Sequence, residues 1–250
     1  MNFFDLVNIS ERYLELVNPT TPEKLLRVGE VLGLQASTRL IDFGCGYGEM
    51  LMLWSERYGS RGVGIDVRPY ACERANTKIA AKGLSDRVTI VCADAAQYAF
   101  SANTFDVATC LGASFIWNSY EQLFNTLARA ITKQGRLVIG DRFWLDRPIP
   151  SDYTARESGV LSDYQFIRKA RQAGFELTYV VWSNHDDWDA YETANWRGLS
   201  QWLDDNPTHR EREEVRAHLR QTQDEYLRYT RNYMGWALYV LAPSAQYVER

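Results

Sequence analysis

Residues 39–48 read RLIDFGCGYG, and this stretch decides the fold of the chain. An apolar run ends at Asp42, and glycines then alternate with other residues at positions 44, 46 and 48. Residues 49–58 follow with the apolar spacing of a helix. Because glycine allows backbone conformations and close approaches that other residues do not, we expect a strand, a tight turn and a helix in that order. The free N–H groups at the start of that helix predict a ligand-binding site.

The alternation of strand and helix continues along the chain. Apolar runs with β-branched residues occupy 62–66, 87–94, 105–112 and 136–141. Helical patterns that end at Gly83 and Gly135 separate the first two of these runs and the last two. Strands that alternate with helices form a parallel sheet with helices on both faces. Residues 175–182 and 235–243 add two strands, so we predict a seven-stranded, mostly parallel, Rossmann-like α/β sheet.

Composition excludes several classes of protein. Lys and Arg number 28 against 32 Asp and Glu, and this net charge of −4 argues against a basic nucleic-acid-binding surface. The four cysteines have no metal-ligand or disulfide-type spacing, and the three histidines are not grouped with them. We therefore predict no metal site and reduced thiols. No apolar run is long enough for a membrane span or a secretion signal, so we expect a cytoplasmic protein without membrane contact.

Three acids close three successive predicted strands, namely Asp42, Asp66 and Asp94. The carboxyl ends of parallel strands lie at one edge of the sheet, and an acid after the second strand can accept both hydroxyls of a ribose. A dinucleotide oxidoreductase would require glycine at position 49, where this chain has Glu49. A pyrophosphate would also meet the negative charges of Asp42 and Glu49, so the pattern favours a cationic or zwitterionic nucleoside.

The motifs from residue 40 to residue 141 resemble those of the class I S-adenosylmethionine-dependent methyltransferases. The matching motifs, in order, are D-x-G-x-G-x-G, the acid after the second strand, Asp94-Ala95, and FDVATCLGA from residue 105. The resemblance implies S-adenosylmethionine as cofactor and an antiparallel last strand. It also implies that the cofactor is held by Asp42, Gly44, Cys45, Gly46 and Gly48 at its amino-acid end, Asp66 at the ribose, Val67, Asp94 and Ala95 around the adenine, and Leu111 near the ammonium group.

Further stretches resemble a group of bacterial small-molecule methyltransferases with unassigned substrates. These are NPTTPEK from residue 18, GDRFW from 140, WDAYETANW from 188 and GWALYVL from 235. We therefore expect one domain over 1–250. Its expected parts are an N-terminal helical segment (1–38), a cofactor-binding half (39–141), a substrate lid and helical insertion (142–234) and a last strand (235–243).

The methyl acceptor is constrained mainly by exclusion. Enzymes that methylate base amines usually carry D/N-P-P-Y/F after the fourth strand, where this chain has CLGA at 110–113, and a cytosine C5 enzyme would need proline before Cys110. We expect a small organic acceptor, with O, N, C or S as nucleophile, and methyl transfer by in-line displacement. There are two alternatives. The enzyme could methylate a protein or RNA, or the chain could be a non-catalytic module that binds S-adenosylmethionine. The protein is expected to be a monomer or homodimer.

Asp141 is the predicted catalytic residue, because it follows the fifth strand at the edge that carries the cofactor acids. It would take a proton from the acceptor or pair with a cationic group, and the competing interpretation is an acid that caps a loop. His185 is a weaker candidate base and fits a surface position better.

Aromatic residues are the predicted lining of the acceptor site. Trp117 and Trp144 follow the fourth and fifth strands and are candidate substrate-binding residues. The methyltransferase resemblance implies that the N-terminal segment folds over the cofactor, which would place Tyr13 near the site. The stripe Trp188, Tyr191, Asn195, Leu199 and Trp202 has helical spacing and is expected to be mostly core.

Overall fold

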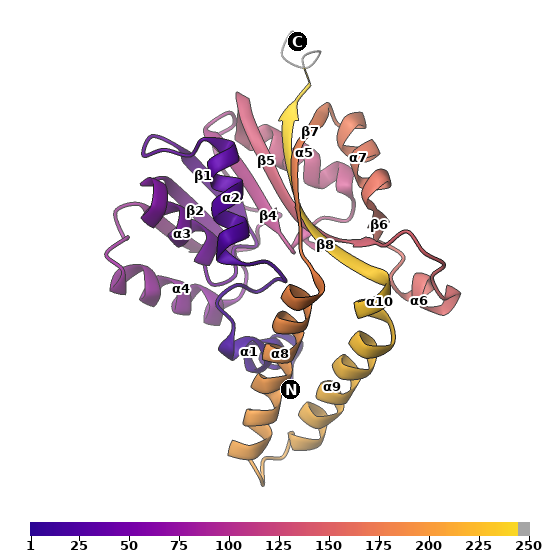
Figure 1. The fold of residues 1–250 in the computed structure, drawn as a ribbon. Coiled ribbons are helices and arrows are strands. Elements are labelled where there is room, and N and C mark those ends of the chain that lie inside the picture. The colour runs from indigo at the N-terminus through magenta and orange to yellow at the C-terminus, as the bar shows by residue number, and fades with distance from the viewer. Residues whose placement is uncertain (245–250) are drawn as a thin grey trace.

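The computed structural model describes residues 1–244, and the last six residues of the predicted domain, 245–250, lie outside the described residues. Its centre is one sheet with strand order β3-β2-β1-β4-β5-β8-β7, and a short β6 also pairs with β5 (Figure 1). The strands are β1 (Arg39–Phe43), β2 (Arg61–Asp66), β3 (Val88–Cys92), β4 (Phe105–Leu111), β5 (Ile131–Trp144), β6 (Leu161–Ser162), β7 (Phe175–Trp182) and β8 (Met234–Pro243).

The pairing of the strands confirms the predicted Rossmann-like arrangement. β1, β2, β3, β4 and β5 run parallel to one another. β8 lies between β5 and β7 and is antiparallel to both, so the antiparallel last strand is confirmed. The seven expected strands are all present, and the two-residue β6 is an addition that the sequence pattern did not indicate.

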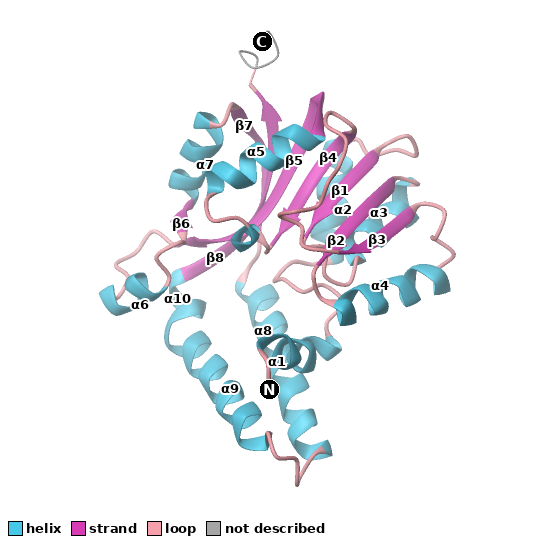
Figure 2. Cartoon of the chain, turned by 180° about the vertical axis from the view of Figure 1, so that it is seen from behind, coloured by secondary structure: helices cyan, strands magenta, loops and turns pink. Residues whose placement is uncertain are grey.

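Helices cover both faces of the sheet (Figures 1 and 2). The helices are α1 (Phe3–Ser10), α2 (Pro22–Leu32), α3 (Glu49–Tyr58), α4 (Pro69–Ala81), α5 (Tyr120–Ala130), α6 (Ser151–Arg156), α7 (Asp163–Gln172), α8 (His185–Asp205), α9 (Arg212–Glu225) and α10 (Arg231–Tyr233). α2, α3 and α4 pack on one face and α5 and α7 on the other, and alternate residues of the strands supply the two apolar cores. Within residues 1–244, no helix is both long enough and apolar enough to cross a membrane.

One expected element boundary differs from the structure. The helix expected to reach Gly135 ends at Ala130, and the chain is already extended at Ile131. Ile131 pairs with Phe105 of β4, so a strand contact of a β-branched residue replaces the last turn of helix. The first helix of the expected lid is α6, which is anchored by the buried ring of Tyr153.

The insertion between β7 and β8 consists mainly of α8 and α9, which project from the carboxyl edge of the sheet (Figure 1). α1 packs on α8, where Gly198 allows close approach. A Cβ atom at Gly198 would lie 2.5 Å from the carbonyl oxygen of Ile9 and even closer to that of Ser10. The N-terminus of the chain is therefore held against the insertion at the same edge as the cofactor acids.

Candidate functional site

Asp42, at the end of β1, is the most deeply buried acid of the predicted cofactor site. Its side chain is 3% exposed and accepts a hydrogen bond from the Thr109 hydroxyl of β4 at 2.6 Å. Burial raises the pKa of Asp42 to about 7, although the bond from Thr109 acts in the opposite direction. Since the carboxyl is near its midpoint at neutral pH, a cationic group placed beside it would draw it into the charged form.

The glycine turn, residues 44–48, has the backbone shape that its sequence predicts. Gly44, Gly46 and Gly48 have φ angles of 75°, 54° and 68°, a region that favours glycine. Side chains at these positions would also collide with neighbours, since a Cβ atom at Gly46 would lie 2.6 Å from Val17 Cγ2. The turn thus exposes backbone without side chains and leads into α3. This arrangement fits the amino-acid end of S-adenosylmethionine.

Asp66, at the end of β2, is 7% exposed and connects the turn to the N-terminal segment. Its carboxylate accepts hydrogen bonds from the backbone N–H of Gly46 at 2.8 Å and of Arg68 at 2.9 Å. The Arg68 guanidinium forms an ion pair with Glu11 at 2.7 Å, and the Tyr47 hydroxyl donates to Glu11 at 3.2 Å. Burial raises the pKa of Glu11. The network of Glu11, Tyr47, Arg68 and Asp66 therefore ties the segment before β1 to the cofactor edge.

The structure brings several predicted cofactor residues into one small cavity of about 20 Å³. Asp42, Gly44, Cys45 and Leu111 line it, and residues 15–18, here named the covering segment, lie over it. A cavity of this size holds about one water molecule. A ligand group larger than a water molecule therefore requires the covering segment to move away from the glycine turn.

The residues predicted around the adenine lie farther out. Ala95 is buried, whereas Asp94 is exposed and accepts a hydrogen bond from the Ala96 N–H at 2.9 Å. Val67 is 51% exposed beside Asp66. Two of the three side chains are thus exposed, and their assignment to the adenine remains a prediction.

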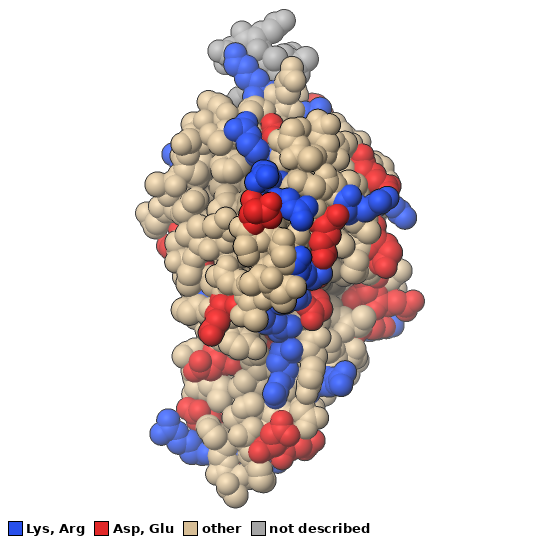
Figure 3. All heavy atoms as spheres, turned by 90° about the vertical axis from the view of Figure 1, so that its left-hand side faces the viewer, with Lys and Arg blue, Asp and Glu red and all other residues tan. Residues whose placement is uncertain are grey.

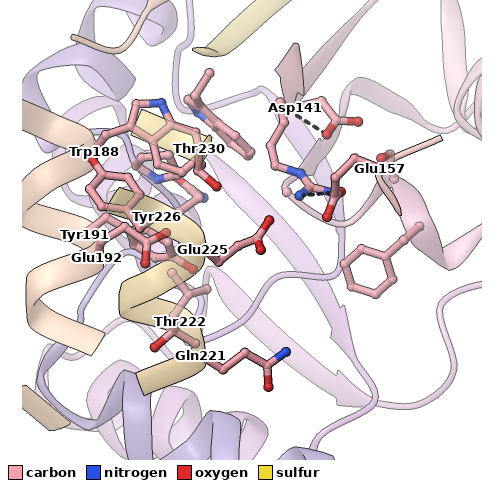
Figure 4. Close-up of a pocket in the computed structure, with 18 of the residues that line it drawn as sticks. Asp141, Glu157, Trp188, Tyr191, Glu192, Gln221, Thr222, Glu225, Tyr226 and Thr230 are labelled. Carbon is pink, nitrogen blue, oxygen red and sulfur yellow. Dashed lines mark hydrogen bonds and ion pairs between the residues drawn. The ribbon is translucent and has the colours of Figure 1, made fainter. Parts of the chain in front are cut away.

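A second cavity, here named the large cavity, has a volume of about 710 Å³ and separates the sheet edge from the insertion (Figure 4). Its lining residues come from five parts of the chain: Phe3; Val17, Asn18 and Pro19; Gly112, Ser114 and Phe115; Asp141, Arg142, Arg156 and Glu157; and Trp188, Tyr191, Glu192, His218, Gln221, Thr222, Glu225, Tyr226, Thr230 and Trp236. Val17 and Asn18 line both cavities. The large cavity is therefore adjacent to the predicted cofactor site.

Asp141 lies in the wall of the large cavity and is 9% exposed. Its carboxylate accepts hydrogen bonds from the Tyr120 hydroxyl at 2.8 Å and the Arg142 N–H at 2.7 Å. β5 continues past it to Trp144, so Asp141 sits within the strand rather than at its end. Sequence analysis missed Tyr120, whose hydroxyl fixes the orientation of the carboxylate.

The two predicted substrate tryptophans occupy different environments. Trp117 is 7% exposed, packs edge-on against Phe43 at 5.7 Å, and lines a cavity of about 290 Å³ that it shares with Asp141. Trp144 packs edge-on against Tyr153 at 5.3 Å and lines neither cavity. Only Trp117 is therefore brought near Asp141.

Tyr13 and His185 are placed away from the large cavity. The ring of Tyr13 is 40% exposed and stacks under the Arg197 guanidinium at 4.4 Å. His185 is the exposed first residue of α8. Neither side chain lines a cavity that contains Asp141.

Glu192 is a cavity residue that sequence analysis missed. It lies on α8, whose start is set by a capping box in which Asn184 and Asp187 exchange hydrogen bonds. Burial raises the pKa of Glu192 to about 7. The available signal was its position one turn after Trp188, which places an acid on the aromatic face of the helix.

Comparisons with known proteins agree with this geometry. A family model described as a methyltransferase domain matches residues 40–135. The solved structure of a SAM-dependent methyltransferase from Geobacter sulfurreducens, in complex with S-adenosyl-L-homocysteine, has a TM-score of 0.89 and 33% identity, and the match covers 96% of this chain and 98% of that one.

Two curated relatives extend the comparison. Escherichia coli protein YjhP is 32% identical over 94% of this chain and 97% of its own length. The 27-O-demethylrifamycin SV methyltransferase of Amycolatopsis mediterranei is 29% identical over 60% of this chain and 58% of its own length. With the strand order, the glycine turn and the buried acids at the carboxyl edge, these likenesses show that the chain belongs to the S-adenosylmethionine-dependent methyltransferases.

Proposed function

We propose that this methyltransferase acts on a small organic molecule bound in the large cavity. The observation that carries the proposal is the position of that cavity, which shares Val17 and Asn18 with the small cavity at the glycine turn. Its volume of about 710 Å³ is of the size that small-molecule sites have in proteins. The relative that methylates 27-O-demethylrifamycin SV also acts on a small molecule.

S-adenosylmethionine supplies an electrophilic methyl group on a sulfonium when it is bound. We propose that the backbone of residues 44–48 and the carboxyl of Asp42 hold its amino-acid end, and that Asp66 accepts hydrogen bonds from its ribose. Ionised Asp42 offers a negative charge to an ammonium group. The Gly46 N–H fixes the Asp66 carboxylate at 2.8 Å, so this side chain is already oriented before a ligand arrives.

We propose that Asp141 receives the proton of the acceptor's nucleophile, or orients that group. The Tyr120 hydroxyl and the Arg142 N–H each bind one carboxylate oxygen, and each oxygen keeps a lone pair for the acceptor. The buried rings of Trp188 and Trp236 contribute apolar surface to the same cavity. In this proposal the chain acts as one domain, with residues 39–141 for the cofactor and residues 142–234 for the acceptor.

The acceptor class is tested by incubating the protein with a metabolite extract and S-adenosylmethionine that carries an isotopic methyl label. We expect the label in a small molecule. Label only in protein or RNA would contradict the proposal, and binding of S-adenosylhomocysteine without any product would identify a non-catalytic module. On the face shown in Figure 3, Lys and Arg are interspersed with Asp and Glu, which does not favour a nucleic-acid groove there.

The role of Asp141 is tested with Asp141→Asn. We expect turnover to fall roughly 100- to 10,000-fold, because the amide cannot take a proton, while affinity for S-adenosylhomocysteine is unchanged. Asp146→Asn is the matched control, since Asp146 is exposed and lies outside the large cavity. If Asp141→Asn keeps full turnover, Asp141 has no catalytic role.

A further inference from the structure

The charges in the wall of the large cavity are unequally matched. Four carboxylates and two guanidiniums line it. Arg142 pairs with Glu157 at 3.1 Å, and Arg156 pairs with Glu225 at 2.8 Å. Asp141 accepts bonds from neutral donors. Glu192 has no hydrogen bond or ion pair with any of residues 1–244. Asp141 and Glu192 are therefore the two lining carboxylates that form no ion pair, and only Asp141 of the two accepts hydrogen bonds.

The surroundings of Glu192 are aromatic. Trp188 lies one helical turn before it and packs on Tyr226 with ring centroids 6.3 Å apart, and Tyr191 packs edge-on against Trp188 at 6.5 Å. Figure 4 shows these three rings and Glu192 on one side of the cavity, opposite Asp141 and Glu157. A cation is attracted both by a carboxylate and by the faces of aromatic rings. This side of the cavity thus has the two elements that recognise a positively charged nitrogen.

Glu192 is half-buried in the wall of the large cavity, and its partial loss of hydration makes a cationic partner favourable. An ionised carboxylate loses hydration when it is removed from water, and a cation beside it compensates for that loss. This loss of hydration raises the pKa of Glu192 to about 7, and the positive charge of Arg142 opposes the increase only in part. A bound cation would restore the charged form.

We propose that the methyl acceptor of this enzyme carries a positively charged nitrogen, which Glu192 holds against the aromatic wall of Trp188, Tyr191 and Tyr226. This proposal rests on the proposed function, because it assigns the large cavity to the acceptor. In this arrangement α8 recognises the positive charge, and the reacting atom of the acceptor lies on the side of Asp141. Glu192 is a binding residue in this arrangement and takes no part in bond making.

The proposal is tested with two probes of equal shape and different charge. Choline carries a quaternary nitrogen, and 3,3-dimethylbutan-1-ol replaces that nitrogen with carbon. We expect choline to bind at least about tenfold more tightly to the protein saturated with S-adenosylhomocysteine, measured by calorimetry or tryptophan fluorescence. Glu192→Gln should remove this preference. Asp186→Asn, which deletes an exposed acid on the same helix outside the cavity, should keep it.

The outcomes separate this proposal from the proposed function. Equal binding of the two probes, or a preference that survives in Glu192→Gln, would overturn the cation site. Failure of both probes to bind at concentrations up to about 10 mM would overturn it as well. The proposed function is judged separately, by binding of S-adenosylhomocysteine and by the labelled product from the extract.

Discussion

The carboxyl group of Asp42 lies between the interior of the sheet and the edge at which the cofactor is expected to bind. It lies beneath the glycine turn, and its one hydrogen bond comes from the neighbouring strand. With a pKa of about 7, it is partly protonated in the ligand-free protein at neutral pH. The charge of this side chain is therefore sensitive to what binds beside it.

Cofactor binding should consequently depend on pH. We expect S-adenosylhomocysteine to bind roughly tenfold more tightly at about pH 8 than at about pH 6, because its ammonium group favours the ionised carboxyl. Calorimetry in two buffers of different ionisation enthalpy should also detect proton release near neutral pH. Asp42→Asn should bind with no such dependence, and a pH-independent affinity of the unmodified protein would contradict the assignment.

The same carboxyl affects stability with a defined sign. Its pKa is raised from 3.8 to about 7 in the folded protein, so its contribution to the free energy of unfolding is complete below about pH 4 and is lost as the pH rises through about 7. Relative to Asp42→Asn, the ligand-free protein should therefore lose roughly 3 kcal/mol of unfolding free energy between about pH 5 and about pH 8. Urea unfolding of both proteins at the two pH values measures this difference in unfolding free energy.

At the scale of residues, sequence analysis located the acids but not their partners. Asp42 and Asp66 could be assigned to one site because the carboxyl ends of parallel strands meet at one edge. Glu11 and Arg68 are 57 residues apart, and Tyr120 and Asp141 are 21 apart. Such contacts depend on where the loops pack against the sheet, and the periodic pattern of apolar residues does not indicate them.

Among the elements, the contact of α1 with α8 depends on the absence of a side chain at Gly198. In Gly198→Ala the new methyl group would meet backbone oxygens of Ile9 and Ser10, which cannot rotate away. We expect a loss of roughly 1–3 kcal/mol in the free energy of unfolding, together with faster tryptic cleavage at Arg12. Gly159→Ala is the control, because nothing lies within 4 Å of its Cβ position. Full stability of Gly198→Ala would show that α1 moves freely on α8.

Element boundaries were predictable where local chemistry defines them. Ser162 caps α7 through a capping box with Gln165, a pattern of residue types that marks a helix start. The end of α5 was not predictable, because Ala130 and the residues after it are compatible with a helix until Ile131 finds its partner Phe105 on β4. A tertiary contact overrides local propensity at that position.

At the scale of the whole molecule, cofactor binding should raise the melting temperature. S-adenosylhomocysteine at about 100 times its dissociation constant adds about 2.7 kcal/mol of stability, which is roughly 5–10 °C for a chain of this size. NAD at the same concentration should cause no shift, because its pyrophosphate would meet Asp42 and Glu49. An equal shift with NAD would contradict the cofactor selectivity inferred from these acids.

The alternation of strands and helices was sufficient to predict the sheet, but the large cavity could not be predicted. Its walls combine the N-terminal segment, β5, α8 and α9, which are far apart in the sequence. The aromatic stripe of α8 was expected to be mostly core, and Trp188 is indeed buried although it also lines the cavity. A single sequence does not distinguish these two roles, because both require an apolar face at helical spacing.

The insertion leaves and re-enters the sheet at neighbouring positions. Trp182 of β7 pairs with Ala237 of β8, and the Ser183 N–H donates to the Trp236 carbonyl at 2.9 Å. The two ends of the intervening segment are therefore as close as the ends of a hairpin loop. Evolution can lengthen, shorten or exchange such a segment without altering the strand pairing below it. The acceptor chamber can thus diversify as a replaceable module without rebuilding the cofactor-binding half.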